Sequence, residues 1–258
     1  MSAPPDYPVS HNLLEGKRVL VTASAGAGIG FATAKRCIEE GAMVVLSDSH
    51  ARRLEEAADT LADVAGDRPL AIPCDVTNQE EVGRLFEQIL EGGPLDVAVN
   101  NAGLGGTAQL VDMTDAEWDA VLDVSLKGTF RCLRAELRHM QDRGRGSIVN
   151  LSSILAWRAQ AGQAHYAAAK AGVAAMTRAA ALEAAPHGVR VNAVAPSIAM
   201  TPFLAKVMPQ EDLDRLVGLE AYGRAAEPWE VANVIVFLAS DLSGYMTGEV
   251  VSVSSQHP

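Results

Sequence analysis

The sequence RVLVTASAGAGIG, at residues 18–30, places a short apolar run directly before a glycine-rich segment. The apolar run Arg18–Thr22 is long enough for a buried strand, and the glycines within Ala23–Gly30 predict a tight turn. The segment that follows, Phe31–Glu40, has the composition of a helix and ends before a glycine. A strand, a glycine-rich turn and a helix in this order are typical of the first unit of a parallel α/β sheet.

The remainder of the chain alternates between strand-like and helix-like segments in the same way. Further strands are predicted at Met43–Ser47, Leu70–Pro73, Leu95–Asn100, Ser147–Leu151, Val189–Ala193 and Glu249–Val253. Helices are predicted at Ala51–Val64, Gln79–Glu91, Asp115–Met140, Ala164–Ala185 and Pro228–Ser240. Because short apolar strands alternate with helices, we predict an α/β fold, a Rossmann-like doubly wound parallel sheet with helices on both faces.

The glycine-rich turn is a candidate phosphate site. Gly26, Gly28 and Gly30 lie where the first helix begins, so backbone amides and the helix dipole are available to a pyrophosphate. Glycines also let the backbone approach a ligand closely. A glycine repeat alone is equally consistent with a simple tight turn, so the assignment depends on its neighbours.

Asp48 supplies such a neighbour, because it ends the second predicted strand, eighteen residues after Gly30. A carboxylate at this position accepts hydrogen bonds from an adenosine ribose and repels a 2′-phosphate, which favours NAD over NADP. Arg52 and Arg53 lie nearby and would favour the opposite choice. They begin a charged amphipathic helix, however, and we interpret them as solvated residues.

A second candidate site begins at HYAAAK, residues 165–170, at the front of an alanine-rich helix. Tyr166 and Lys170 are four residues apart and therefore share one helical face. Ser153 follows a predicted buried strand and is expected beside that helix. The three side chains make a candidate acid/base site, although a tyrosine and a lysine at this spacing also occur on many surface helices.

The chemistry of the second site explains the choice of side chains. A free phenol titrates near pH 10, so Tyr166 is a poor base at neutral pH without a positive neighbour. At about 5 Å and an effective dielectric of about 20, Lys170 would stabilise the phenolate by roughly 3 kcal/mol, or about two pKa units. The hydroxyl of Ser153 would hydrogen-bond the substrate oxygen while Tyr166 moves a proton.

Composition restricts the partners and the compartment. A chain of 258 residues with 48% hydrophobic content can bury a sizeable core, in one large domain or two smaller ones. A net charge of −11 argues against nucleic acid or an anionic membrane surface and favours a small solute. The scattered cysteines, Cys37, Cys74 and Cys132, suit a reducing cytoplasm, and we expect neither a disulfide nor a metal site.

The first fourteen residues contain three prolines and predict an irregular arm, with no signal peptide and no membrane span elsewhere. Residues 15–258 are then expected to form the dinucleotide-binding catalytic domain.

Along nearly its whole length the chain resembles the short-chain dehydrogenase/reductase family. The motifs that carry this resemblance are GIG at 28–30, CDVT at 74–77, NNAG at 100–103, IVNLSS at 148–153, YAAAK at 166–170, VNAVAP at 191–196 and GRAAEPWEVA at 223–232. The resemblance implies a single domain with a doubly wound seven-stranded sheet, which interconverts alcohols and ketones with a dinucleotide.

The resemblance also implies residue roles. Tyr166 would be the acid/base, Lys170 would bind the nicotinamide ribose and lower the tyrosine pKa, and Ser153 would orient the reacting oxygen. The residues expected at the cofactor are Ser24, Gly26, Gly28, Ile29, Gly30, Asp48, Asp75, Val76, Asn101, Gly103, Tyr166, Lys170 and Thr201.

The chain departs from the family pattern in four places. The glycine-rich turn is one residue longer than usual, with Ala23 where the family has glycine, and Ser197 likewise replaces a glycine. Ser125 stands where the family usually has the asparagine of a proton relay, so we include it as a fourth catalytic candidate. The chain finishes in SSQHP at 254–258 instead of an aspartate followed by two glycines.

The long glycine-rich turn, DVSL at 123–126, WRAQ at 157–160 and the SSQHP ending together resemble the actinobacterial steroid-degrading members of the family, which oxidise a ring hydroxyl on a hydrindane propanoyl-CoA. The expected substrate lid, residues 198–222, carries the apolar residues Met200, Phe203, Leu204, Val207, Met208, Leu213, Leu216, Val217 and Leu219. This pattern suits a bulky alicyclic substrate. It equally suits an ordinary amphipathic helix, and Arg158 either meets an anionic CoA tail or is simply solvated.

Other functions remain open. A 3-oxoacyl carrier-protein reductase would normally prefer NADPH and a basic surface, and both Asp48 and the net charge oppose it. A redox-silent dinucleotide-binding regulator is opposed by the presence of Tyr166 and Lys170. The family resemblance also implies a homotetramer, which the alanines between Ala167 and Ala185 would permit through close helix approach.

Overall fold

The computed structural model describes residues 3–201, 204 and 210–256. Seven parallel strands form one sheet in the order β3-β2-β1-β4-β5-β6-β7. The strands are β1 Arg18–Thr22, β2 Met43–Asp48, β3 Leu70–Pro73, β4 Val97–Asn100, β5 Gly146–Leu151, β6 Val189–Pro196 and β7 Val250–Val253. The predicted doubly wound parallel sheet is confirmed: β2 and β3 are added on one side of β1, and β4 to β7 follow on the other side.

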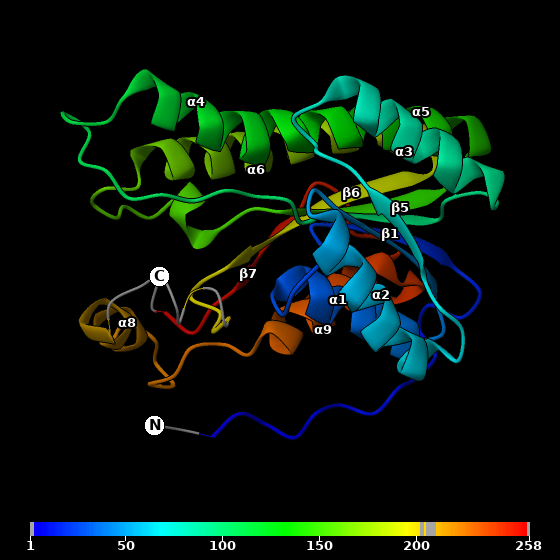
Figure 1. Ribbon diagram of the computed structural model, residues 1–258, viewed down its shortest axis with the longest axis horizontal. Coiled ribbons are helices and arrows are strands. Elements are labelled where there is room, and N and C mark those ends of the chain that lie inside the picture. The colour runs from blue at the N-terminus through cyan, green and yellow to red at the C-terminus, as the bar shows by residue number, and fades with distance from the viewer. Residues whose placement is uncertain (1–2, 202–203, 205–209, 257–258) are drawn as a thin grey trace.

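Two layers of helices cover the sheet, one on each face (Figure 1). One layer holds α1 Ile29–Glu39, α2 Ala51–Ala65 and α9 Pro228–Ala239. The other holds α3 Gln79–Glu91, α4 Asp115–Leu122, α5 Thr129–Arg143 and α6 Ala164–Ala184. A short helix, α8 Gln210–Val217, lies apart from both layers.

The central strands are apolar throughout because both of their faces are covered. In β1, Val19 and Val21 pack in the core under α1, α2 and α9, while Leu20 packs in the core under α3, α5 and α6. All three side chains are fully buried. Successive strand residues point to opposite faces of the sheet. Burial of each Val or Leu side chain, on either face, contributes about 1.5–3 kcal/mol to the stability of the fold.

The helix predicted at Asp115–Met140 is present, but it is not α-helical throughout. A π-helical turn at Asp123–Gly128 separates α4 from α5. Gly128 is required in this turn because a Cβ there would lie 2.6 Å from the Cγ2 of Val76. The sequence did not indicate this change from α to π geometry, and π turns often occur near functional sites.

The irregular arm packs against the domain. The ring of Tyr7 meets that of Trp229 edge-on, with centroids 5.3 Å apart, and its hydroxyl donates to the carboxylate of Glu39 at 2.8 Å. The backbone amides of His11 and Leu13 donate to Glu40 at 2.9 and 3.1 Å. The arm therefore lies along α1 and α9 (Figure 1).

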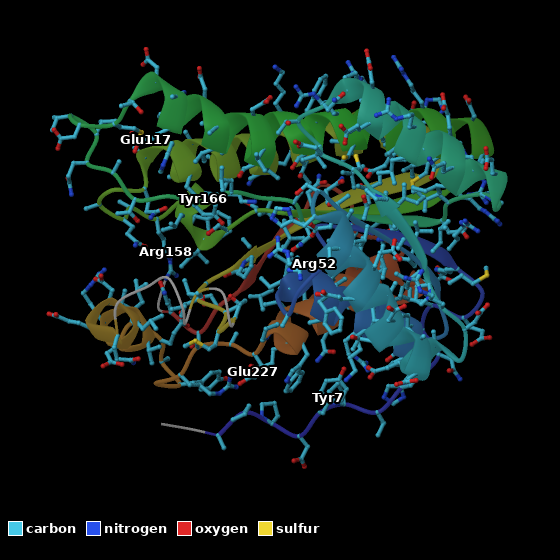
Figure 2. The ribbon with its side chains drawn as sticks, viewed as in Figure 1. Tyr7, Arg52, Glu117, Arg158, Tyr166 and Glu227 are labelled. Carbon is cyan, nitrogen blue, oxygen red and sulfur yellow. The ribbon has the colours of Figure 1, made fainter. Side chains whose placement is uncertain are left out.

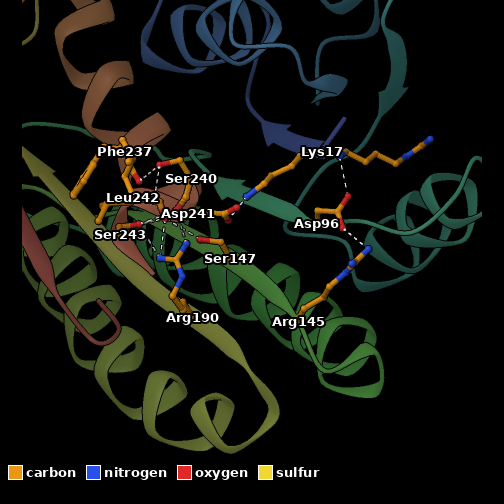
Figure 3. A network of polar contacts seen from close by, with 12 residues as sticks. Lys17, Asp96, Arg145, Ser147, Arg190, Phe237, Ser240, Asp241, Leu242 and Ser243 are labelled. Carbon is orange, nitrogen blue, oxygen red and sulfur yellow. Dashed lines mark hydrogen bonds and ion pairs between the residues drawn. The ribbon is translucent and has the colours of Figure 1, made fainter. Parts of the chain in front are cut away.

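Polar contacts at the amino ends of the strands secure the end of α9 (Figure 3). Arg190, at the start of β6, donates to the carbonyls of Leu238 and Ser240 at 2.9 and 3.0 Å. It also donates to the hydroxyl of Ser243 at 2.9 Å. A guanidinium at a helix C-terminus satisfies carbonyls that have no partner within the helix.

No helix in the described part of the chain is both long enough and apolar enough to cross a membrane. The same residues contain no group of three or more His, Cys, Asp or Glu arranged to hold a metal ion. Cys37, Cys74 and Cys132 are buried free thiols.

Candidate active site

Ser153, Tyr166 and Lys170 meet at the carboxyl ends of the strands, as the sequence predicts. Ser153 follows β5 and caps a short 3₁₀ turn, where its hydroxyl accepts from the amide of Leu155 at 3.2 Å. Tyr166 and Lys170 lie in the first two turns of α6. A hydrogen bond joins the side chains of Ser153 and Tyr166.

Lys170 is buried beneath the tyrosine. Its ammonium lies 5.6 Å from the centroid of the Tyr166 ring and donates to the carbonyl of Leu151 at 2.7 Å. The backbone carbonyl of Lys170 accepts from the hydroxyl of Ser152 at 2.9 Å, which further ties α6 to β5. The cation is therefore held in one place relative to the phenol.

Burial controls both titrations in the chain without ligands. It lowers the pKa of Lys170 to about 8, because the ammonium loses its hydration. It also raises the pKa of Tyr166, and the hydrogen bond with Ser153 opposes this shift only in part. In the chain alone, burial is thus the larger influence on the phenol, and the lowering of its pKa by Lys170 stays a prediction.

The glycine-rich turn is held open by short backbone contacts. The side-chain amide of Asn101 donates to the carbonyls of Thr22 and Ala23 at 3.1 and 3.0 Å. A Cβ at Gly30 would lie 2.2 Å from the carbonyl oxygen of Ala23, so only glycine fits. Ala23 has a φ of 50°, in the left-handed region that glycine adopts at low cost.

The N-terminus of α1 faces this turn. Gly28 is its N-cap and provides no side chain to pair with the first amides. Gly26 has a φ of 85°, and a Cβ there would meet no atom within 4 Å, so the turn leaves open space. Free amides around an open turn fit a pyrophosphate, which agrees with the roles expected for Gly26, Gly28, Ile29 and Gly30.

Ser24 lies under the turn. Its side chain is fully buried, and its hydroxyl donates to the carbonyl of Ser47 at 3.2 Å and accepts from the amide of Ser47 at 3.1 Å. Its own amide donates to the same carbonyl at 3.1 Å. We therefore assign Ser24 to shaping the turn, whereas the sequence suggested a direct contact with a cofactor.

Asp48 ends β2 beside the turn, where the sequence predicts it. Its carboxylate accepts from the amides of Ala25 and His50 at 3.2 and 2.9 Å. Burial raises its pKa, and the hydrogen bond from Ala25 opposes this rise. The contact with Ala25 joins the carboxylate directly to the proposed phosphate turn.

The remaining expected cofactor residues follow the carboxyl ends of β3, β4 and β6. Asp75 follows β3, and its carboxylate accepts from the amide and hydroxyl of Thr77 at 2.9 and 2.8 Å, while the adjacent Val76 is buried. A Cβ at Gly103 would lie 3.3 Å from the ammonium of Lys170. The methyl group of Thr201 would lie 3.9 Å from a Cβ at Gly28. Gly103 therefore lies beside Lys170, and Thr201 lies beside the glycine-rich turn.

Ser125 is fully buried within the π-helical turn. Its hydroxyl donates to the carbonyl of Leu104 at 3.0 Å and accepts from the amide of Leu104 at 2.9 Å. A serine hydroxyl has one donor and two acceptor sites, so one acceptor site remains for another donor. Ser125 fixes the loop that carries Gly103, which the sequence alone did not indicate.

A pocket of about 550 Å³ is lined by the candidate catalytic residues Ser153 and Tyr166. Its lining residues are Gly103, Leu104, Gly105, Gly106, Thr107, Ser153, Ile154, Leu155, Gln160, Gln163, Tyr166, Ser197, Ile198, Leu204, Leu216 and Gln256. Three residues of the expected lid, Ile198, Leu204 and Leu216, are among them, and Leu213 of the lid is buried. The expected lid residues Phe203, Val207 and Met208 lie outside the described residues.

Arg158 lies on the side of Tyr166 that faces α8 (Figure 2). Its guanidinium donates to the side-chain oxygen of Gln256 at 2.6 Å, so it is not simply solvated. Sequence analysis assigned no role to Gln256. The unusual SSQHP ending was the signal that pointed to this segment.

The site agrees with a match to a known family over most of the chain. Residues 23–255 match the family profile described as enoyl-(acyl carrier protein) reductase. The chain belongs to the short-chain dehydrogenase/reductase family. It is accordingly an oxidoreductase that acts on CH–OH groups, and the predicted family is confirmed.

Members of the short-chain dehydrogenase/reductase family from mycobacteria are similar to the whole chain. A Mycobacterium tuberculosis protein named (5R,7aS)-5-hydroxy-7a-methyl-1-oxo-2,3,5,6,7,7a-hexahydro-1H-indene-carboxyl-CoA reductase is 57% identical, covering 100% of this chain and 99% of that protein. A crystal structure of a short-chain dehydrogenase from Mycobacterium smegmatis has 54% identity, a TM-score of 0.88 and 99% coverage of both chains. The predicted resemblance to steroid-degrading members agrees with the first of these relatives.

A more distant relative represents the alternative function. A 3-oxoacyl-[acyl-carrier-protein] reductase of Thermotoga maritima is 39% identical, covering 93% of this chain and 97% of that protein.

Proposed function

We propose that this enzyme interconverts a ring hydroxyl and a ketone on a fused-ring substrate linked to coenzyme A, with NAD as cofactor. The observation that carries the proposal is the pocket of about 550 Å³, in which Ser153 and Tyr166 are surrounded largely by apolar and small residues. Such a lining suits a bulky alicyclic ring system. The 57% identity to the mycobacterial hexahydroindene-carboxyl-CoA reductase supports the substrate class.

The residues of the chain divide the chemistry between them. NAD, when bound, accepts or supplies the hydride at its nicotinamide. In the oxidative direction Ser153 and Tyr166 hydrogen-bond the carbinol oxygen, and the Tyr166 phenolate accepts the hydroxyl proton. The ammonium of Lys170 stabilises that phenolate and binds the nicotinamide ribose. In the reductive direction the phenol of Tyr166 returns the proton.

The cofactor preference in this proposal rests on Asp48. Its carboxylate, joined to the amide of Ala25, is suited to accept hydrogen bonds from an adenosine ribose and to repel a 2′-phosphate. Asp75, Val76, Asn101 and Thr201 complete the proposed contacts.

A substitution at Asp48 tests this preference. The unmodified enzyme should show a higher kcat/KM with NAD than with NADP, and Asp48→Ala should narrow that margin. Equal efficiency with the two cofactors in the unmodified enzyme would overturn the choice of NAD.

We also propose a cytoplasmic homotetramer. Free buried thiols at Cys37, Cys74 and Cys132 suit a reducing compartment. The helices α4, α5 and α6 supply the proposed interface, and Phe130 on α5 is 42% exposed in the single chain. Sedimentation at micromolar concentration would give a tetramer, and a monomer would contradict this part of the proposal.

A substrate panel tests the proposed function directly. Purified enzyme is supplied with NAD and with secondary alcohols that include hydroxy-hydrindane CoA thioesters, and NADH formation is followed by absorbance. The fused-ring thioesters should give the highest kcat/KM. A 3-hydroxyacyl carrier protein oxidised more efficiently than every fused-ring compound would favour the alternative function as a 3-oxoacyl carrier-protein reductase.

A further inference from the structure

Gln256 belongs to the wall of the substrate pocket, although it lies about ninety residues from Tyr166 along the chain. Gln256 follows β7. Its side chain contacts Arg158, in the loop after β5, and Glu220, near the end of the expected lid segment. The structure places its side chain between a cation, Arg158, and an anion, Glu220. Figure 2 shows Arg158 between Tyr166 and α8, where this segment passes.

The carboxylate of Glu220 is held almost entirely by this segment. It is only 5% exposed, and it accepts from the amide and hydroxyl of Ser255 at 3.1 and 2.8 Å. The side-chain nitrogen of Gln256 donates to its other oxygen at 2.9 Å. The backbone amide of Ala221 donates in return to the carbonyl of Ser255 at 3.0 Å. A buried carboxylate with these donors fixes the position of Gln256.

The orientation of the Gln256 amide follows from its two neighbours. A guanidinium has donors only, so the side-chain oxygen must face Arg158, which donates to it at 2.6 Å. The nitrogen must then face Glu220, because an ionised carboxylate only accepts. Rotation of the amide by 180° would place its N–H groups against the donors of Arg158 and its oxygen against the acceptor oxygen of Glu220. The amide is therefore fixed in a single orientation.

A primary amide nitrogen carries two N–H groups, and Glu220 takes one of them. Within the described part of the chain, the second N–H of the Gln256 side chain has no protein acceptor. Since Gln256 lines the pocket, its second N–H is a donor of fixed direction that a substrate oxygen can accept. A donor that is already oriented loses little entropy when it binds.

We propose that Gln256 is a specificity-determining residue, which donates a hydrogen bond to a ring ketone of the substrate remote from the reacting carbinol. This inference rests on the proposed function, because the name of the M. tuberculosis relative combines a ring hydroxyl with a ring ketone in one CoA-linked molecule. Arg158 and Glu220 act as positioning residues, since each fixes one end of the amide.

The test compares two CoA-linked hydroxy-hydrindanes, one with the ring ketone and one with a methylene group in its place. The unmodified enzyme should oxidise the ketone-bearing compound with a kcat/KM roughly three- to tenfold higher, the value of one hydrogen bond. The difference should appear mainly in KM, because the contact is remote from the reacting atoms. In Gln256→Ala the two compounds should be oxidised with equal efficiency.

Two further variants separate substrate binding from structural support. Gln256→Glu keeps the shape of the side chain and an acceptor for Arg158 but removes both N–H groups. Combining it with Glu220→Gln restores a hydrogen bond between the two side chains without restoring the free donor. The double variant should therefore recover thermal stability relative to Gln256→Glu and still fail to discriminate between the compounds.

The control is Gln79→Ala, which removes another arginine–glutamine contact, that of Arg134 with Gln79 on α3, away from the pocket. It should retain the discrimination of the unmodified enzyme. Equal use of both compounds by the unmodified enzyme, or discrimination that persists in Gln256→Ala, overturns the role of Gln256 and leaves the proposed function standing. Oxidation of neither compound, with NADH formed from another secondary alcohol, overturns the proposed function instead.

Discussion

Tyr166 carries a phenol that lies in the pocket, close to Ser153 and above Lys170. Tyr166→Phe keeps the ring and deletes the proton acceptor, so we predict a fall in kcat by a factor on the order of 10² to 10⁴. Binding of NAD should change little, because the phenyl ring still fills the site. Steady-state kinetics and a titration of NAD binding give the two values.

The pH profile provides the check on this assignment. Burial raises the pKa of Tyr166 in the chain alone, while the cationic nicotinamide of bound NAD⁺ adds a positive charge that lowers it. The oxidation rate should rise with pH through the pKa of the complex, since the phenolate is the base. A Tyr166→Phe enzyme with near-normal turnover and the same acidic limb would mean that another residue is the base.

Ala23 is a second position where one side chain has a measurable effect. Its φ of 50° costs a non-glycine residue about 1–2 kcal/mol, which glycine would avoid. Glycine in turn makes the unfolded chain more flexible, which offsets about 0.4–1 kcal/mol of that gain in stability. Ala23→Gly should therefore stabilise the protein by about 0.5–1 kcal/mol, which raises Tm by roughly 1–4 °C. Thermal unfolding measures it, and an unchanged or lower Tm would mean that the turn holds Ala23 without strain.

At the scale of elements, the π-helical turn Asp123–Gly128 places Ser125 against the loop at Leu104. Ser125→Ala leaves the amide and carbonyl of Leu104 without these partners, so the pocket wall should loosen. We predict that Ser125→Ala lowers kcat by less than about tenfold. This effect should be milder than those of Ser153→Ala, Lys170→Ala and Tyr166→Phe. A loss as large as that of Tyr166→Phe would assign a proton-relay role to Ser125.

The elements themselves were largely predictable from the sequence. Each predicted strand lies within three residues of its observed bounds, because fully buried strands are apolar on both faces and end at turn residues. The π-helical turn that joins α4 to α5 was not predictable, since the sequence pattern alone does not mark its one extra residue.

The candidate site was predictable only where a motif carries the chemistry. Tyr166, Lys170 and Ser153 have recognisable spacing and lie together as expected. The burial of Ser24 and the contact of Gln256 with Glu220 depend on tertiary packing between segments far apart in sequence. Side-chain orientation of this kind leaves no local pattern.

At the scale of the whole molecule, the two ends of the parallel strands have different roles. The pocket lies at the carboxyl ends, while the network in which Arg190 caps α9 lies at the amino ends (Figure 3). A buried chain of polar groups also crosses the core. Asn100 on β4 donates to the carboxyl group of Glu136 at 2.9 Å and to the side chain of Asn150 at 3.0 Å, and Asn150 donates to Thr177 on α6.

This buried network gives the stability of the molecule a pH dependence through Glu136. Burial raises the pKa of this carboxyl from 4.5 to about 8, so between these values the folded chain holds a proton that the unfolded chain releases. The stabilising effect of that proton is complete below pH 4.5 and is lost as the pH rises toward 8. Glu136→Gln mimics the protonated form, and its stability relative to the unmodified enzyme should increase with pH by up to about 1.4 kcal/mol per unit across this window. Urea unfolding from pH 5 to pH 9 measures the difference, with the exposed Glu87→Gln as the control for losing one negative charge. A difference that stays constant with pH would show that Glu136 is ionised in the folded chain.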